Sequence, residues 1–135
     1  MSSTFPAEGM ALTNILVVDD IRAARDFYVE TLGASLYREY GGTSVVVQFL
    51  GAWILLVTGG GPTADKPDVH FVAPENVNRV QHAMTIRVPD CRAAHAILSE
   101  RGAQFLTDPV ESEYEVRAFF RDPAGHLLEI SEFKG

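Results

Sequence analysis

The sequence predicts an α+β fold in which one β-α-β-β-β module occurs twice in tandem. The strongest indication is an internal repeat, since the segment 18–24 returns 70 positions later as 88–94, with Val, Asp, Arg, Ala and Ala at the same five offsets. A second indication is that each copy leads into a helical pattern ended by a glycine, Gly33 or Gly102. A third is that runs typical of strands follow each glycine. Two such modules usually enclose a space between them.

The first module is predicted to occupy residues 11–58. A strand over 12–18 leads to Asp20, whose residue type commonly caps the start of a helix, and apolar residues then recur at helical spacing as far as Leu32. Three further strands are expected, because apolar runs are separated by short turns that contain glycine. We place these strands at 34–39, 44–50 and 53–58.

The second module is predicted over residues 82–135 and has the same order of elements. A strand over 82–88 is followed by Asp90, which is expected to cap the second helix. The inner side of this helix is predicted to carry Ala94, Ile97 and Leu98. Three strands then follow at 104–107, 116–121 and 126–133. Residues 59–81, rich in Gly, Pro and Asp, are predicted to be a linker, and residues 1–10 a flexible tail.

Composition and charge restrict the classes of partner. The formal net charge is −7 and the 11 Lys and Arg residues are scattered, so the chain lacks the basic patch that binds nucleic acid. Its longest apolar runs, within 45–50 and 53–57, fall well short of the roughly 20 residues that span a membrane. The first ten residues do not resemble a secretory signal, and the single cysteine cannot form a disulfide within the chain. We therefore expect a cytoplasmic protein that binds neither nucleic acid nor membrane.

Two segments resemble signature motifs of a known superfamily. They are 20–28 (DIRAARDFY), followed by Leu32 and Gly33, and 119–129 (FFRDPAGHLLE). On these residues and the repeat, the chain resembles the vicinal oxygen chelate superfamily, which includes glyoxalase I, extradiol dioxygenases, fosfomycin-resistance proteins and bleomycin-binding proteins. The resemblance covers nearly the whole chain and implies a single domain over 11–135, in which the two modules form a curved mixed sheet around a central cleft. It does not fix the chemistry, because this fold hosts several reactions as well as plain binding.

The resemblance also implies where a divalent metal would bind, namely on the first and last strands of each module. The corresponding positions in this chain are Thr13, Leu55, Ala83 and Glu129. Only Glu129 offers a metal ligand, whereas a catalytic metal needs about three protein ligands and an open position. We therefore expect no metal and no other cofactor. The alternative is one divalent ion held by Glu129 and His82, which would need a bulge or a register slip, because side chains alternate between the faces of a strand.

Glu129 is also the candidate catalytic residue. As a lone carboxylate among apolar walls it could serve as a general base, or it could pair with an arginine. Arg87 and Arg117 are expected on the same face of the sheet. We favour the pairing, because buried charges are seldom left without a partner.

The rest of the predicted concave face is apolar and aromatic, as small-molecule sites usually are. The predicted ligand-binding residues are Trp53, Leu55, Thr85, Arg87, Arg117 and Phe119. The two aromatic rings are suited to stacking on a planar ligand, and the arginines match an anionic group such as a carboxylate. The ligand is therefore expected to be a small aromatic or anionic molecule. An alternative is that the aromatic residues only fill the space between the modules.

These observations predict a protein that binds or sequesters a small molecule without a metal, similar to the bleomycin-binding branch of the superfamily. The alternative is a metal-dependent enzyme such as a lyase, isomerase or dioxygenase, using Glu129 and His82. A third possibility is a member without catalysis that mainly oligomerises. Members of the superfamily commonly form dimers, so we expect a homodimer, and the linker is long enough for the modules to pair within one chain or between two.

Overall fold

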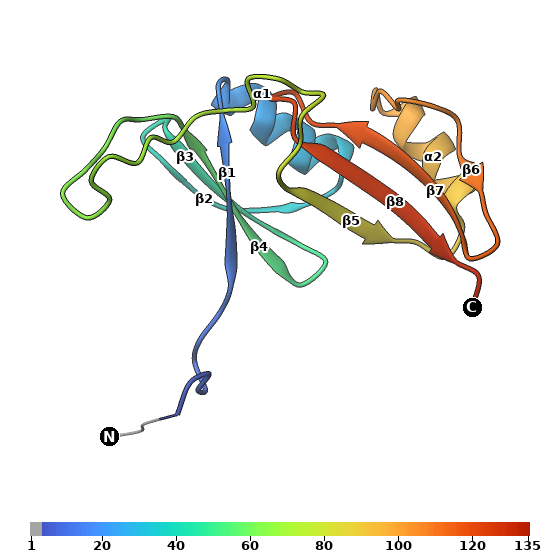
Figure 1. Ribbon diagram of the computed structural model, residues 1–135, viewed down its shortest axis with the longest axis horizontal. Helices are drawn as coiled ribbons and strands as arrows, with labels where there is room; N and C mark the ends of the chain where they lie inside the picture. Colours follow the sequence, from blue (N-terminus) through green and yellow to red (C-terminus); the bar gives the residue numbers. More distant parts are fainter. Residues whose placement is uncertain (1–3) are drawn as a thin grey trace.

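The computed structural model describes residues 4–135, and within them the predicted α+β class and the repeated module are confirmed. Figure 1 shows module one (residues 11–58) at the left and module two (residues 82–135) at the right, with the linker crossing between them. Residues 4–12 form neither helix nor strand and extend away from both modules. Residues 1–3 of the predicted tail lie outside the described residues.

Module one follows the predicted order of elements. They are β1 (Thr13–Val18), α1 (Ile21–Asp26), η1 (Phe27–Thr31), β2 (Ser35–Tyr40), β3 (Ser44–Phe49) and β4 (Ala52–Thr58). The strands form a sheet in the order β1-β4-β3-β2, in which β1 and β4 are parallel and the other pairs antiparallel. A parallel pair needs a crossover connection, and in this module the connection includes the helix that covers one face of the sheet.

Module two repeats this arrangement. Its elements are β5 (Ala83–Arg87), α2 (Cys91–Glu100), β6 (Val110–Glu111), β7 (Glu115–Arg121) and β8 (Leu127–Phe133). The sheet order is β5-β8-β7-β6, again with one parallel pair, β5 and β8. No helix within residues 4–135 has the length and apolar character needed to cross a membrane.

Both α-helices begin where the repeated aspartates predict. Asp20 and Asp90 have extended backbones, and Oδ1 of each accepts a hydrogen bond of 3.0 Å from the backbone N–H three residues later. Such a cap satisfies one of the free N–H groups at a helix start and contributes about 1 kcal/mol. Gly33 and Gly102 follow the helices with φ of 83° and 100°, which glycine adopts without steric cost. The repeat therefore encodes where each helix starts and stops.

The helices differ from prediction at two points. The first helix does not continue regularly to Leu32 but changes after Asp26 into a turn of π-helix, η1. As a result the neighbouring side chains of Phe27 and Tyr28 both reach the core. On α2, Ile97 is exposed instead of facing inward, because Cys91 and Leu98 are the residues of this helix that are buried against the sheet.

The strand predicted over 104–107 does not form. Phe105 makes a single bridge to Phe120, and its ring packs between the ring of Phe120 and that of His95, at centroid distances of 4.9 and 4.2 Å. Packing of this ring into the core takes the place of a ladder of backbone hydrogen bonds. The short β6 occupies the last position of the sheet instead.

The two modules meet through the sheet faces that carry the helices. The rings of Phe27 and Phe120 lie 6.3 Å apart, and the buried hydroxyl of Tyr28 donates a hydrogen bond of 2.8 Å to Asp122 Oδ2. His126 Nε2 donates across the same junction to the backbone oxygen of Val17, at 2.8 Å. The buried apolar side chains of both modules accordingly form one core.

This junction leaves the opposite face of each sheet pointing away from it, because alternate side chains of a strand point to opposite faces. Within residues 4–135, no strand of one sheet is hydrogen-bonded to a strand of the other. The chain by itself therefore contains two four-stranded sheets instead of the single curved sheet that we expected. The predicted concave faces are not enclosed between the modules of one chain.

Candidate functional site

Each sheet has one face without a helix, which we call the open face of its module. The strand registers assign the residues of each face. The open face of module one consists of Thr13, Ile15, Val17, Ser44, Val46, Gln48, Trp53, Leu55 and Val57, with Arg38 of β2 paired with Val46. The open face of module two consists of Ala83, Thr85, Arg87, Glu115, Arg117, Phe119, Arg121, Leu127, Glu129, Ser131 and Phe133. Every predicted ligand-binding residue, and Glu129, lies on one of these two faces.

The open face of module one is apolar and partly exposed. Leu55 pairs with Ile15 on one side and with Val46 on the other, so that three aliphatic side chains form a row across the sheet. Ile15 is 48% exposed although it lies in the middle of a strand. The ring of Trp53 meets the ring of Tyr37 edge-on, with 5.0 Å between centroids. This face offers a continuous aliphatic and aromatic surface.

On the open face of module two, Glu129 is held by two partners. The hydroxyl of Thr85, on the neighbouring strand, donates a hydrogen bond of 2.5 Å to Oε1. Arg117 Nη1 lies 3.7 Å from Oε2, and the Glu129 side chain is 15% exposed. The predicted pairing of Glu129 with an arginine is therefore confirmed, and the partner is Arg117. The two contacts hold the carboxylate between a hydroxyl and a guanidinium.

A second pair extends this polar network along the same face. Arg87 Nη1 donates to Ser131 Oγ at 2.8 Å, and the Ser131 hydroxyl donates in turn to Glu115 Oε1 at 2.6 Å. The other oxygen of Glu115 lies 3.9 Å from Arg117 Nη1. Because Ser131 is fully buried, this chain of hydrogen bonds fixes Arg87 and Glu115 against the sheet.

Both arginines also lie over aromatic rings. The guanidinium carbon of Arg117 is 5.4 Å from the centroid of Phe119, and that of Arg87 is 5.9 Å from the centroid of Phe133. At these distances a cation is attracted to the ring face. The open face of module two therefore combines guanidinium groups and aromatic rings that lie close to one another.

Three residues of the site were not predicted from the sequence. Glu115 and Ser131 each lie two residues from a predicted site residue on the same strand, and this period of two is the signal that identifies them. Tyr37 lies where β2 bulges, since the register with β3 shifts between Leu36 and Arg38. A bulge changes the face on which a residue lies, so alternation alone does not place Tyr37.

The divalent-metal site that the superfamily implies does not fit the side chains of this chain. Thr13, Leu55 and Ala83 offer neither imidazole nor carboxylate, and Glu129 already contacts Thr85 and Arg117. Within residues 4–135, no three His, Cys, Asp or Glu side chains lie close enough together to hold a metal ion. A single engaged carboxylate is too few ligands for a catalytic site.

His82 does not complete such a site. β5 begins at Ala83 and pairs with β8 without a register break, so the slip that would turn His82 toward Glu129 does not occur. The His82 side chain is exposed and instead lines a pocket beside the linker.

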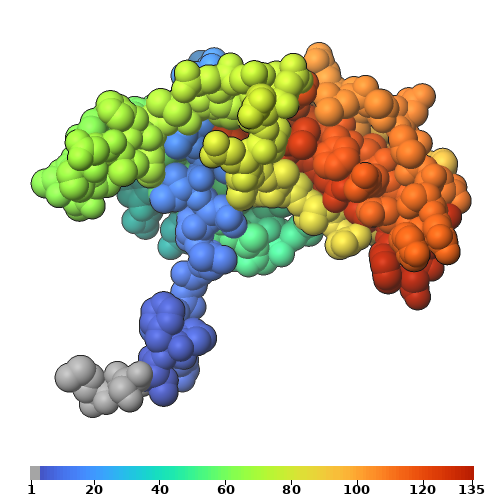
Figure 2. All heavy atoms as spheres, in the orientation of Figure 1, coloured from blue at the N-terminus to red at the C-terminus, as the bar shows by residue number. Residues whose placement is uncertain are grey.

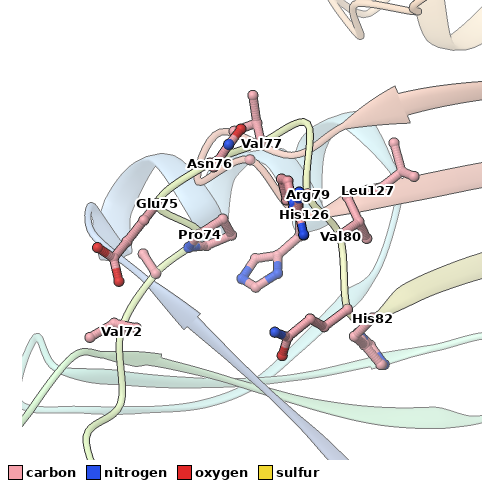
Figure 3. A pocket seen from close by; sticks show the side chains of 13 residues that line it. Val72, Pro74, Glu75, Asn76, Val77, Arg79, Val80, His82, His126 and Leu127 are labelled. Atoms are coloured by element: carbon pink, nitrogen blue, oxygen red, sulfur yellow. The ribbon is translucent and has the colours of Figure 1, made fainter.

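This linker pocket has a volume of about 330 Å³ and lies against the turn that precedes β8. Figure 3 shows the imidazole of His126 pointing into it, between Pro74 and His82. Arg121 holds the linker in place by donating to Asn78 Oδ1 at 3.2 Å. In the space-filling view of Figure 2 the linker lies over the boundary between the modules. Since His126 also bonds across the junction, the pocket belongs to the module junction more than to either open face.

Solved structures share this fold over nearly the whole chain. A glyoxalase/bleomycin resistance protein/dioxygenase from Nocardioides aligns with a TM-score of 0.72 and 18% identity, covering 94% of this chain and 85% of that one. A lactoylglutathione lyase from Agrobacterium tumefaciens aligns with a TM-score of 0.71 and 18% identity, covering 94% and 95%. TnmS3, an antibiotic binding protein from Streptomyces sp. CB03234, aligns with a TM-score of 0.65 and 25% identity, covering 95% and 98%.

No functionally curated protein matches the chain. The family model of the Glyoxalase/Bleomycin resistance protein/Dioxygenase superfamily matches residues 10–130, which include both modules and the linker. This match agrees with the repeated module and with the two signature segments, all of which lie within the matched residues. The chain belongs to the Glyoxalase/Bleomycin resistance protein/Dioxygenase superfamily.

Proposed function

We propose that this protein binds and sequesters a small organic molecule on its open faces, without a resident metal. The observation that carries the proposal is the pairing of Glu129, whose carboxylate contacts Thr85 and Arg117 next to partly exposed aromatic surface. A carboxylate held in this way keeps a hydroxyl and a guanidinium oriented, which suits a binding site. The similarity to TnmS3 supports the proposal, since that protein is described as antibiotic-binding.

In this proposal the aromatic rings provide contact area and the polar network orients the ligand. Phe119 on module two, and Trp53 with Tyr37 on module one, stack against planar rings of the ligand. Arg117 retains N–H donors for the ligand, because a guanidinium carries five and the carboxylates do not engage all of them. Glu129 is then a positioning residue that holds Arg117 and Thr85 in place.

We further propose that a homodimer completes the binding cleft. Within one chain the open faces point away from the module junction, so a second copy is needed to bring the open face of module one against that of module two. The aliphatic row at Ile15, Val46 and Leu55 is partly exposed and supports contact with a second copy, since extended apolar patches usually mark interaction sites. A two-fold axis would then create two identical clefts, each with residues from both chains.

The binding proposal is tested with 2-naphthol, an uncharged planar probe, by calorimetry. Binding should also change the fluorescence of Trp53, which is the only tryptophan of the chain. Phe119→Ala should weaken binding up to about tenfold, because an aromatic contact contributes about 0.5–1.5 kcal/mol beyond its buried area. Phe5→Ala, which removes an exposed ring from the segment before β1, should leave the affinity unchanged.

Two results would contradict this proposal. Equal affinities of the wild-type protein and Phe119→Ala would place the probe elsewhere. Retention of a divalent metal at one equivalent by the purified protein, lost in Glu129→Ala, would favour the metal-dependent enzyme instead.

The shared cleft is tested by mixing two defective variants, Trp53→Ala and Phe119→Ala. If each cleft combines module one of one chain with module two of the other, a heterodimer of these variants contains one intact and one doubly altered cleft. Co-expression should therefore restore wild-type affinity at one site per heterodimer. If each chain carries its own complete site, the mixture will bind as weakly as the separate variants.

A further inference from the structure

We infer that the ligand is an uncharged planar aromatic molecule, neither an anion nor a cation. The inference rests on the proposed function and specifies its ligand class. It differs from the expectation drawn from the arginines alone, which favoured an anionic group as one alternative. The structure no longer favours an anion, because Arg117 already contacts two carboxylates and Arg87 is linked to one of them through a serine hydroxyl.

The charges on the open face of module two cancel one another. Arg117 lies between the carboxylates of Glu129 and Glu115, at 3.7 and 3.9 Å. Arg87 is linked to the same Glu115 through the buried hydroxyl of Ser131. Two guanidinium groups therefore share two carboxylates within one network. An incoming carboxylate would approach an Arg117 whose charge is already offset by two carboxylates, and both of them would repel it.

A cation finds no better site on this face. Glu129 is engaged at both oxygens and its side chain is mostly buried, and Glu115 faces Ser131 with one oxygen and Arg117 with the other. The guanidinium groups beside the rings of Phe119 and Phe133 would repel a second cation that approached these rings. A positively charged ligand would therefore meet two arginines before it met a free carboxylate.

The surfaces beside this network add one cation, at the edge of module one. On the open face of module one, the residues of β1, β3 and β4 include no ionisable side chain, and Arg38 of the edge strand β2 lies with its guanidinium 5.7 and 5.9 Å from the ring centroids of Tyr37 and Tyr40. Arg121 follows the same alternation on β7, but its guanidinium donates to Asn78 Oδ1 and to the backbone oxygen of Val77 in the linker. Its charge is thus directed to the linker. What remains for a ligand is aromatic and aliphatic surface with hydrogen-bond donors and acceptors in fixed positions, which suits an uncharged planar molecule.

The experiment compares three probes with the same bicyclic ring by calorimetry at pH 7. They are 2-naphthol, which is uncharged, 2-naphthoate, which is an anion, and 2-naphthylmethylammonium, which is a cation. The wild-type protein should bind 2-naphthol at least tenfold more tightly than either charged probe. Glu129→Gln should reverse the order of the first two probes, because Arg117 then lacks its nearer carboxylate. Glu115→Gln should shift the order in the same direction, and thermal unfolding checks that both variants are folded.

The matched control is Glu100→Gln, which makes the same change in net charge at an exposed position on α2 and should leave the order of the probes unchanged. Tighter binding of either charged probe by the wild-type protein overturns the inference, while the proposed function stands. An unchanged order in both Glu129→Gln and Glu115→Gln also overturns it, because the carboxylates then do not set the preference. If none of the three probes binds, the proposed function itself fails.

Discussion

Replacing Asp122 with alanine should destabilise the folded protein by on the order of 4 kcal/mol, because a hydrogen bond to a charged group contributes about 1.5–3 kcal/mol and this carboxylate accepts several. Oδ1 accepts from the backbone N–H groups of Ala124, Gly125 and His126, at 2.9 to 3.0 Å. Oδ2 accepts from the hydroxyl of Tyr28 in the other module. Asp122 is itself buried, so water does not replace these contacts in the folded state.

Urea unfolding of Asp122→Ala, followed by circular dichroism, measures this loss. Tyr28→Phe is the matched variant, because it removes only the bond between modules and leaves the turn intact, and it should cost about 2 kcal/mol. If the two variants lose equal stability, the turn contacts contribute nothing and only the junction matters. A loss below about 1 kcal/mol for Asp122→Ala would mean that the buried carboxylate is dispensable.

The same residue explains how the signature segment serves the site. The turn held by Asp122 places His126 where its ring bonds to Val17, so the segment fixes one module against the other. That junction uses the helix-bearing faces and leaves both open faces turned outward. The geometry of the proposed cleft therefore depends on contacts that lie outside it.

The local part of the fold was predictable because its causes are local in sequence. Asp20 and Asp90 cap helices three residues ahead, and Gly33 and Gly102 end the first helical segment and α2 by their backbone conformations. The alternation of strand residues likewise placed Trp53 and the other predicted site residues on the open faces. These signals act over a few residues and do not depend on tertiary packing.

What the sequence did not indicate arises from contacts between distant segments. The π-helical turn at Phe27 and Tyr28 brings both side chains to the core where they meet module two, and Phe105 leaves its predicted strand to stack on Phe120. Nothing within either segment signals these partners. Tertiary packing also decides which arginine pairs with Glu129, since alternation gives a face but no distance.

Above about pH 10 the stability of the protein should fall with rising pH, and Tyr28 should be a main cause. Burial first, and then the neighbouring carboxylate of Asp122, raise the pKa of Tyr28 well above its ordinary value. The unfolded chain therefore loses this proton near pH 10 while the folded chain keeps it, so the folded state binds more protons and stability falls by up to about 1.4 kcal/mol per pH unit. At about 1.5 units above that value the loss is about 2 kcal/mol.

Two measurements test this titration. In an ultraviolet absorbance titration, the difference between the wild-type protein and Tyr28→Phe reports the Tyr28 hydroxyl, and its ionisation should appear only on unfolding. In urea unfolding at several alkaline pH values, the stability difference between the wild-type protein and Tyr28→Phe should shrink as the pH rises, because phenylalanine has no proton to lose. A stability difference that stays constant with pH, or ionisation of Tyr28 before unfolding, would show that the Tyr28 hydroxyl is not protected by the junction. Since this hydroxyl bonds to Asp122, loss of its protection would also mean that the modules separate without global unfolding, and the open faces would then not be held in fixed orientations.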